Sequence, residues 1–282
     1  MLENFNPTEP ATKLIEKVSN AIGVLYEPTR TIRMAKAEAK SDKIRALSKL
    51  ELSEIEQRAV VRVINEEAKA QENIESITVK AAKAVSENSQ PESIDDDWLS
   101  FFFEKCKRVS DEDMQTLWAN ILAEEANSPR NFSKRAIEAA SLLDKREAEL
   151  FTSLCRFSAD IMTPYLFIFG GNHPFVNQAG IDFNALIELE AAGLIKFNTD
   201  SGFALQNNEH NSTMVILGYF DKIISLNAPA GTRGIPYGGV MFTGVGRQLR
   251  GICNAEPLPG FAEYLRGAYS DLRITVTENQ RS

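Results

Sequence analysis

Histidine and cysteine, the side chains that most often bind transition metals, are scarce in this sequence of 282 residues. It contains two histidines, His173 and His210, and three cysteines, Cys106, Cys155 and Cys253. Neither histidine has partners at the spacing of a structural zinc site. The cysteines are odd in number and far apart in the sequence, which excludes a disulfide framework and a paired-cysteine metal knuckle. We therefore predict no metal site, and we would name no residue as catalytic.

Long apolar runs are also missing. No stretch approaches the roughly 18 apolar residues of a membrane-spanning helix. The N-terminal residues MLENFNPTEP lack the positive start and apolar run of a secretory signal. The net charge is −8 and the isoelectric point is near 5.1, so the chain as a whole is poorly suited to nucleic acid. These absences predict a cytoplasmic protein, with peripheral contact at the inner membrane left open.

A complete phosphate-binding loop is absent as well. The segment FTGVGRQL has Gly244 and Gly246 after an expected strand, but it lacks a third glycine and the lysine of a mononucleotide loop. The favoured interpretation is that the two glycines let a strand turn directly into a helix. We therefore expect no cofactor.

Proline and glycine are absent from residues 29–86, where strong helix formers dominate. This composition predicts one or two long helices, with Ser53 and Glu56 as a capping box if the segment breaks there. Apolar residues recur at three-to-four spacing, among them Ile44, Ile55 and Val63. Either a helical hairpin or an intermolecular coiled coil could bury such a stripe.

Positive charge gathers at the start of this segment. Five cations at spacings of three, three, four and three lie along one helical side: Arg30, Arg33, Lys36, Lys40 and Lys43. This basic stripe is a candidate surface for an anionic partner, either a phosphate backbone or an anionic lipid. The alternative is a solvated helix face whose charges pair with neighbouring acids. We favour the alternative because the whole chain is acidic.

The polar segment ENSQPESIDDD, residues 87–97, predicts a linker into a small helical bundle. Ser110, followed by three acidic residues, predicts a helix start. The pair Glu124 and Glu125 has the oxygen ligands that a divalent cation needs, although a solvated helix end is the favoured interpretation. The bulky side chains expected in the bundle core are Trp98, Met114, Leu117, Trp118, Ile121 and Leu122.

The last part of the chain shows helices followed by short strands, an order typical of a winged helix. A helix is expected to about residue 160, and a second one ends in LIELEAAGLI. Residues 182–192 would be the DNA-reading helix, but they contain three acids and no base. This composition favours a winged helix that serves protein interaction or structure.

The predicted fold class is mainly α, with a C-terminal α+β domain. Long charged and amphipathic helices are expected in residues 1–90, and the small bundle in residues 91–144. The winged-helix-like α+β domain is expected in residues 145–282.

Four stretches together resemble an uncharacterised family of bacterial proteins. They are ATKLIEKVSNAIG with the following YEP, QRAVVRVINEEAKAQENIESI, SDEDMQTLWANILAEEANSPRNFSKRAI, and LIELEAAGLI with MFTGVGRQL. Within the third stretch, SDEDMQTLWANILAEE also resembles a motif of the abortive-infection alpha proteins, which are implicated in bacterial self-sacrifice against phage. The resemblances supply no catalytic residue. They imply a bacterial, cytoplasmic protein with a role in phage defence.

The sequence therefore favours a non-enzymatic, oligomerising interaction or regulatory protein, with homo-oligomer formation or a protein partner expected. Two alternatives depend on residues 30–49. In the first, the protein is a nucleic-acid-binding regulator that uses the basic stripe. In the second, it is a membrane-associated effector.

Overall fold

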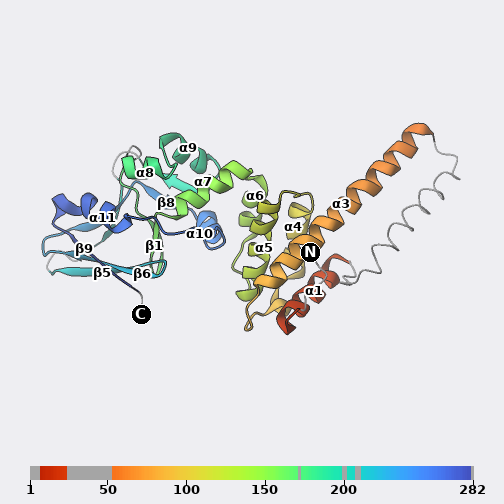
Figure 1. The fold of residues 1–282 in the computed structure, drawn as a ribbon, viewed down its shortest axis with the longest axis horizontal. Helices are drawn as coiled ribbons and strands as arrows, with labels where there is room; N and C mark the ends of the chain where they lie inside the picture. Colours follow the sequence, from red (N-terminus) through yellow and green to blue (C-terminus); the bar gives the residue numbers. More distant parts are fainter. Residues whose placement is uncertain (1–6, 24–52, 171–172, 199–201, 207–210, 281–282) are drawn as a thin grey trace. The chain divides into compact units, whose positions relative to one another are not determined.

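A computed structural model describes residues 7–23, 53–170, 173–198, 202–206 and 211–280 (Figure 1). The chain divides into two compact units, Met1–Ile137 and Glu138–Ser282, and each is described by itself. Within the described ranges, no helix is long and apolar enough to cross a membrane. The basic stripe from Arg30 to Lys43 lies outside the described residues.

The described part of the first unit is helical, which confirms the prediction of a helical N-terminal region. Its elements are α1 (Glu9–Ile22), α3 (Glu54–Ala84), the 3-10 turn η1 (Pro91–Ser93), α4 (Asp96–Cys106) and α5 (Glu112–Asn127). Helix α6 (Lys134–Leu142) begins in this unit and ends in the second. The capping box at the start of α3 is present, because the main-chain N–H and the hydroxyl of Ser53 both donate to the carboxylate of Glu56.

An aromatic cluster forms the centre of this unit. Trp98 stacks on Phe102 with ring centroids 5.2 Å apart, and Phe102 meets Trp118 edge-on at the same separation. The indole N–H of Trp98 donates to the main-chain oxygen of Phe132 at 2.8 Å. Because α4 supplies Trp98 and Phe102 and α5 supplies Trp118, the cluster joins these two helices and the segment after α5.

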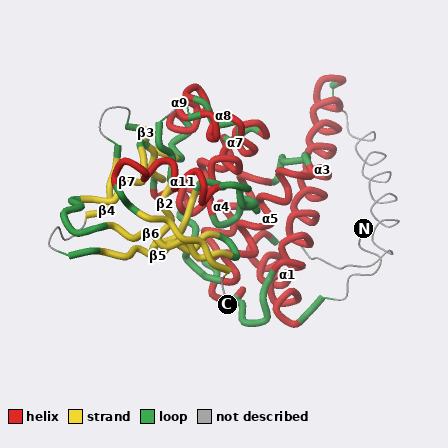
Figure 2. The backbone as a smooth tube through the Cα atoms, turned by 60° about the vertical axis from the view of Figure 1, so that its left-hand side comes forward, coloured by secondary structure: helices red, strands yellow, loops and turns green. Residues whose placement is uncertain are grey.

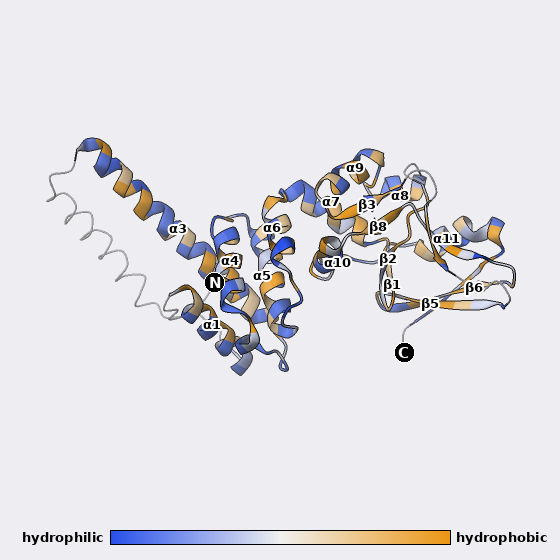
Figure 3. Ribbon diagram, turned by 180° about the vertical axis from the view of Figure 1, so that it is seen from behind, coloured by the Kyte–Doolittle hydropathy of each residue, from blue (hydrophilic) through white to orange (hydrophobic). Residues whose placement is uncertain are grey.

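Helix α3 is buried along only part of its length. Hydrophilic and hydrophobic residues nevertheless alternate along the whole helix (Figure 3). From Ala70 onward it buries a stripe that includes Asn73, Ile77 and Ala81, at helical spacing. Before Ala70 every residue is exposed except Val60 and Ile64, which are half-buried. We call residues 54–69 the α3 arm.

The second unit combines five helices with strands. The helices are α7 (Lys145–Cys155), α8 (Pro174–Gln178), α9 (Phe183–Ala191), α10 (Gly244–Arg250) and α11 (Phe261–Tyr269), and a 3-10 turn η2 (Ser270–Leu272) follows the last. The strands are β1 (Ser158–Ile161), β2 (Thr163–Leu166), β3 (Ile195–Phe197), β4 (Phe203–Gln206), β5 (Thr213–Tyr219), β6 (Lys222–Ala228), β7 (Gly234–Gly238), β8 (Val240–Phe242) and β9 (Thr275–Gln280).

Five of the strands form an antiparallel sheet in the order β2-β1-β5-β6-β9 (Figure 2). The remaining four form two ladders, β3 with β8 and β4 with β7. Helix α11 covers one face of the sheet, where Phe261 stacks on Tyr219 of β5 with ring centroids 4.2 Å apart. Arg266 of the same helix donates to the main-chain oxygen of Val276 in β9.

The prediction of a mainly α chain ending in a winged helix is wrong. The C-terminal half is built around the five-stranded sheet, and the strand after α9 does not form a hairpin with its neighbour. Instead, Ile195 of β3 lies opposite Phe242 of β8, with β4 to β7 between them in the sequence. Single-sequence patterns indicated short strands, but pairing between distant strands is decided by packing that no local pattern contains.

The helix expected to run to about residue 160 ends at Cys155. Residues 158–161 form β1 and turn at Met162, whose φ is 71°, into β2. Ala159 is fully buried in this hairpin, and Asp160 lies opposite Gly218 of β5. Tertiary pairing therefore outweighs the helix propensity of this short segment.

Candidate functional site

The residues expected in the bundle core lie on α4 and α5. Trp98, Trp118, Ile121 and Leu122 are buried, whereas Met114 and Leu117 on the same helix are half-buried. Trp98 and Trp118 both contact Phe102 in the aromatic cluster. The structure gives this part of the motif a packing role.

The acidic start of α5 is also a structural feature. Asp111, one residue later than the expected Ser110, caps the helix by accepting from the main-chain N–H of Asp113 and of Met114. In α4, Asp95 accepts in the same way from the N–H of Trp98 at 2.8 Å. Carboxylates at these positions satisfy free amides and favour the positive helix end.

A buried polar pair joins α3 to α5, and the sequence analysis missed it. The side-chain amide of Gln115 donates to the Asn73 side-chain oxygen at 3.2 Å and to the Val109 main-chain oxygen at 3.0 Å. The Asn73 amide donates in turn to the main-chain oxygen of Lys107 at 2.9 Å. The sequence signal for this pair was Asn73, an amide side chain at a position of the otherwise apolar buried stripe of α3. Because each amide is satisfied, the pair fixes the register of the two helices rather than offering a binding site.

Glu125 corrects the interpretation of a solvated helix end. Its side chain is buried, and its two oxygens accept from the main-chain N–H of Arg130 at 2.7 Å and of Phe132 at 2.9 Å. Burial raises the pKa of this carboxyl, although the amide hydrogen bonds oppose that shift. Through these two hydrogen bonds Glu125 holds the loop after α5.

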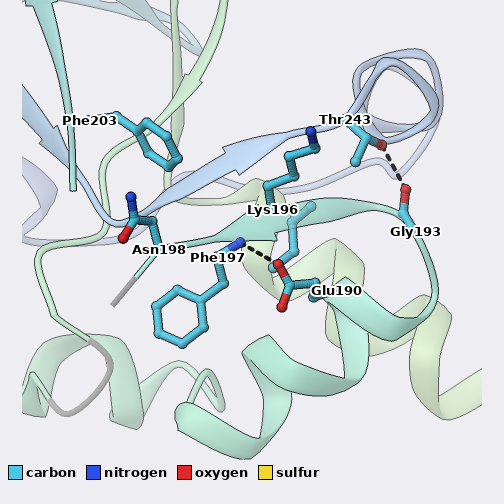
Figure 4. A pocket seen from close by; sticks show the side chains of 8 residues that line it. Glu190, Gly193, Lys196, Phe197, Asn198, Phe203 and Thr243 are labelled. Atoms are coloured by element: carbon cyan, nitrogen blue, oxygen red, sulfur yellow. Dashed lines mark hydrogen bonds between the residues drawn. The ribbon is translucent and has the colours of Figure 1, made fainter. Parts of the chain in front are cut away.

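A pocket of about 480 Å³ opens beside β3 in the second unit (Figure 4). It is lined by Glu190, Gly193, Ile195, Lys196, Phe197, Asn198, Phe203 and Thr243. Two of its polar groups are already engaged: Glu190 accepts from the Phe197 N–H at 2.8 Å, and the Thr243 hydroxyl donates to the Gly193 oxygen at 2.7 Å. The lining contains no histidine or cysteine, so it offers neither a thiol nor an imidazole for nucleophilic or acid–base chemistry.

The two glycines of FTGVGRQL have different roles. Thr243 caps α10 by accepting from the N–H of Gly246 at 3.0 Å. A Cβ on Gly246 would come within 1.9 Å of the main-chain oxygen of Leu194, whereas a Cβ on Gly244 would meet nothing within 4 Å. Gly246 therefore permits close packing of α10 against the β3 region, in line with the strand-to-helix interpretation.

Cysteines that are distant in the sequence meet in the fold. Cys155 at the end of α7 contacts Cys253 after α10, and both are free thiols. Burial, and then the hydrogen bond with Cys253, raises the pKa of Cys155 well above its usual value. Burial likewise raises the pKa of Cys106. Thiols held protonated in this way are poor nucleophiles.

His173 serves as the N-cap of α8, because its Nδ1 accepts from the main-chain N–H of Phe175 at 3.2 Å. His210 lies outside the described residues. No group of three histidine, cysteine, aspartate or glutamate residues in the described ranges is arranged to hold a metal ion.

The comparisons with known proteins give one match. No curated protein and no solved structure is significantly similar to the chain. The model of a family described as "Protein of unknown function (DUF2806)" matches residues 57–266, which include the α3 arm from Gln57, the α4–α5 core and most of the second unit. Because this match covers most of the sequence, the chain belongs to that family of proteins of unknown function.

Proposed function

We propose that this protein is a non-enzymatic, oligomerising interaction protein and that the α3 arm is one of its contact surfaces. The observation that carries the proposal is the exposure of large aliphatic side chains on this arm. Ile55 is 69% exposed, Val63 48% and Val61 41%. Exposed aliphatic groups gathered on one helical segment mark a site of protein interaction.

The energetics favour a partner for the arm. Fully burying one aliphatic side chain contributes about 1.5–3 kcal/mol. A partner helix along the side that carries Ile55 and Val63 would therefore gain about two such contributions. Exposed pairs such as Arg62 with Glu66 would remain at the rim.

Light scattering on the full chain tests this proposal. The double substitution Ile55→Glu with Val63→Glu places two carboxylates in the contact, so we expect the mass in solution to fall. Leu142→Glu is the matched control, because Leu142 is also exposed but lies on α6. An unchanged mass of the double variant, with the control also unchanged, would refute a contact through the arm.

The biological setting that we propose is anti-phage defence in a bacterium. It is supported by the resemblance of residues 110–125 to the motif of the abortive-infection alpha proteins. Phage should form fewer plaques on bacteria that carry the gene than on bacteria without it. The double arm variant should restore the number of plaques. Equal plaque numbers with and without the gene would contradict this setting.

A further inference from the structure

On the side opposite α11, strands β5, β6 and β9 carry exposed and half-buried side chains, and we call this face of the three strands the outer sheet face. Three rows of side chains cross β5, β6 and β9 on this face. The central row is Ile216, Ser225 and Thr277. In the row on one side Met214 of β5 lies opposite Asn227 of β6, and in the row on the other side Gly218 lies opposite Ile223. On the inward side of these strands, Leu217 and Leu226 are fully buried.

The outer sheet face carries no ionisable side chain and combines exposed aliphatic residues with small polar ones. Met214 is 60% exposed and Ile216 is 52% exposed. None of the nine residues in the three rows is ionisable, although 25% of the chain is charged. The nearest acid along the sheet is Asp160, opposite Gly218, and its carboxylate is paired with both terminal nitrogens of Arg250 at 3.0 and 3.1 Å.

These properties limit what can bind. Nucleic acid and anionic lipid both need cations, which the rows lack. A charged peptide would leave its charge unpaired against Met214 and Ile216, at a desolvation cost. A partner that is itself uncharged and flat avoids both penalties.

A second copy of this chain meets that description. Two copies with a net charge of −8 each repel one another in most orientations, and the repulsion is smallest where their contact surfaces carry no charge. In a two-fold symmetric contact the same patch appears on both sides, so any charge near the axis faces its own like charge. A neutral face of aliphatic and small polar side chains satisfies this condition, and two sheets can pack about 10 Å apart with their side chains interdigitating.

We propose that the outer sheet faces of two copies pack against each other, so that Met214 and Ile216 are buried in a symmetric contact. This contact is separate from the α3 arm and goes beyond the assembly proposed above. Where the two contacts join different pairs of copies, the assembly contains more than two copies.

Four proteins compared by light scattering at the same concentration test the inference. They are the wild type, the double arm variant, Ile216→Arg, and all three substitutions together. We expect the wild type to exceed the mass of a dimer, the double arm variant and Ile216→Arg each to form dimers, and the triple variant to be a monomer. If Ile216→Arg keeps the wild-type mass, or if the wild type is itself a monomer, the sheet contact is overturned. If only the double arm variant loses mass, the contact through the α3 arm is supported and the sheet contact is overturned.

Two further variants separate this result from misfolding. Ile187→Arg is the matched control, because Ile187 is 46% exposed but lies on α9, and it should keep the wild-type mass. Ser225→Lys places a cation in the central row by substitution of a half-buried polar residue. It should lower the mass as Ile216→Arg does, with an unchanged circular dichroism spectrum. A folded Ser225→Lys protein of wild-type mass would contradict the inference.

Discussion

The buried carboxylate of Glu125 connects the end of α5 to the loop that follows. Because its oxygens accept from the N–H groups of Arg130 and Phe132, removing the side chain leaves buried amides without partners. Each such group costs about 1–3 kcal/mol. We expect Glu125→Ala to lower the free energy of unfolding by about 3 kcal/mol in urea denaturation. Glu124→Ala, its half-buried neighbour, should change it by less than about 0.5 kcal/mol. Equal losses of unfolding free energy in the two variants would contradict the role of Glu125 in holding the loop.

The same residue gives the stability a dependence on pH. Burial raises the pKa of Glu125 in the folded chain above its value in the unfolded chain, so the folded state takes up the proton more readily. The stabilisation from this uptake is complete below the unfolded pKa of about 4.3, and it is lost as the pH rises through the folded pKa. The stability of the wild type relative to Glu125→Gln should therefore increase as the pH is lowered toward 4. Parallel pH profiles of the two proteins would refute the raised pKa.

At the scale of elements, the joint between β8 and α10 depends on one glycine. A methyl group at Gly246 would clash with the main-chain oxygen of Leu194, and backbone atoms cannot rotate away as a side chain does. We expect Gly246→Ala to destabilise the protein by about 1–3 kcal/mol in thermal or urea unfolding. Gly244→Ala, two residues earlier, should leave the stability unchanged or raise it by up to about 1 kcal/mol. If Gly244→Ala proved less stable than Gly246→Ala, α10 would not be packed in this way.

The long helix α3 shows how one element can have two environments. Its capping box at Ser53 was visible as a local pattern in the sequence. Of the apolar stripe named there, Ile55 and Val63 are exposed, and the buried stripe begins only at Ala70. Which half of the helix is covered was not visible, because the spacing of apolar residues continues into the exposed arm. The partner of that arm, and any contact of the basic stripe with nucleic acid or membrane, stay predictions.

At the scale of the whole molecule, the second unit has its own core. Its buried side chains include Phe157, Phe167, Tyr219, Phe261 and Tyr269, all from residues after Glu138. A unit with a core of this kind can fold by itself. We expect a fragment of residues 138–282 to give a dispersed amide spectrum by nuclear magnetic resonance and to unfold cooperatively. A fragment with the narrow amide dispersion of a disordered chain would contradict this expectation.

The sequence by itself determined the features that depend on neighbours along the chain. The helical N-terminal region, the capping box at Ser53 and the strand-to-helix joint at Gly246 all follow from local spacing and backbone chemistry. The tertiary structure alone decided which strands pair, that Cys155 meets Cys253, and that Glu125 is buried rather than solvated. Those outcomes depend on contacts between residues far apart in the sequence, and their free energy comes from packing and desolvation that no local pattern contains.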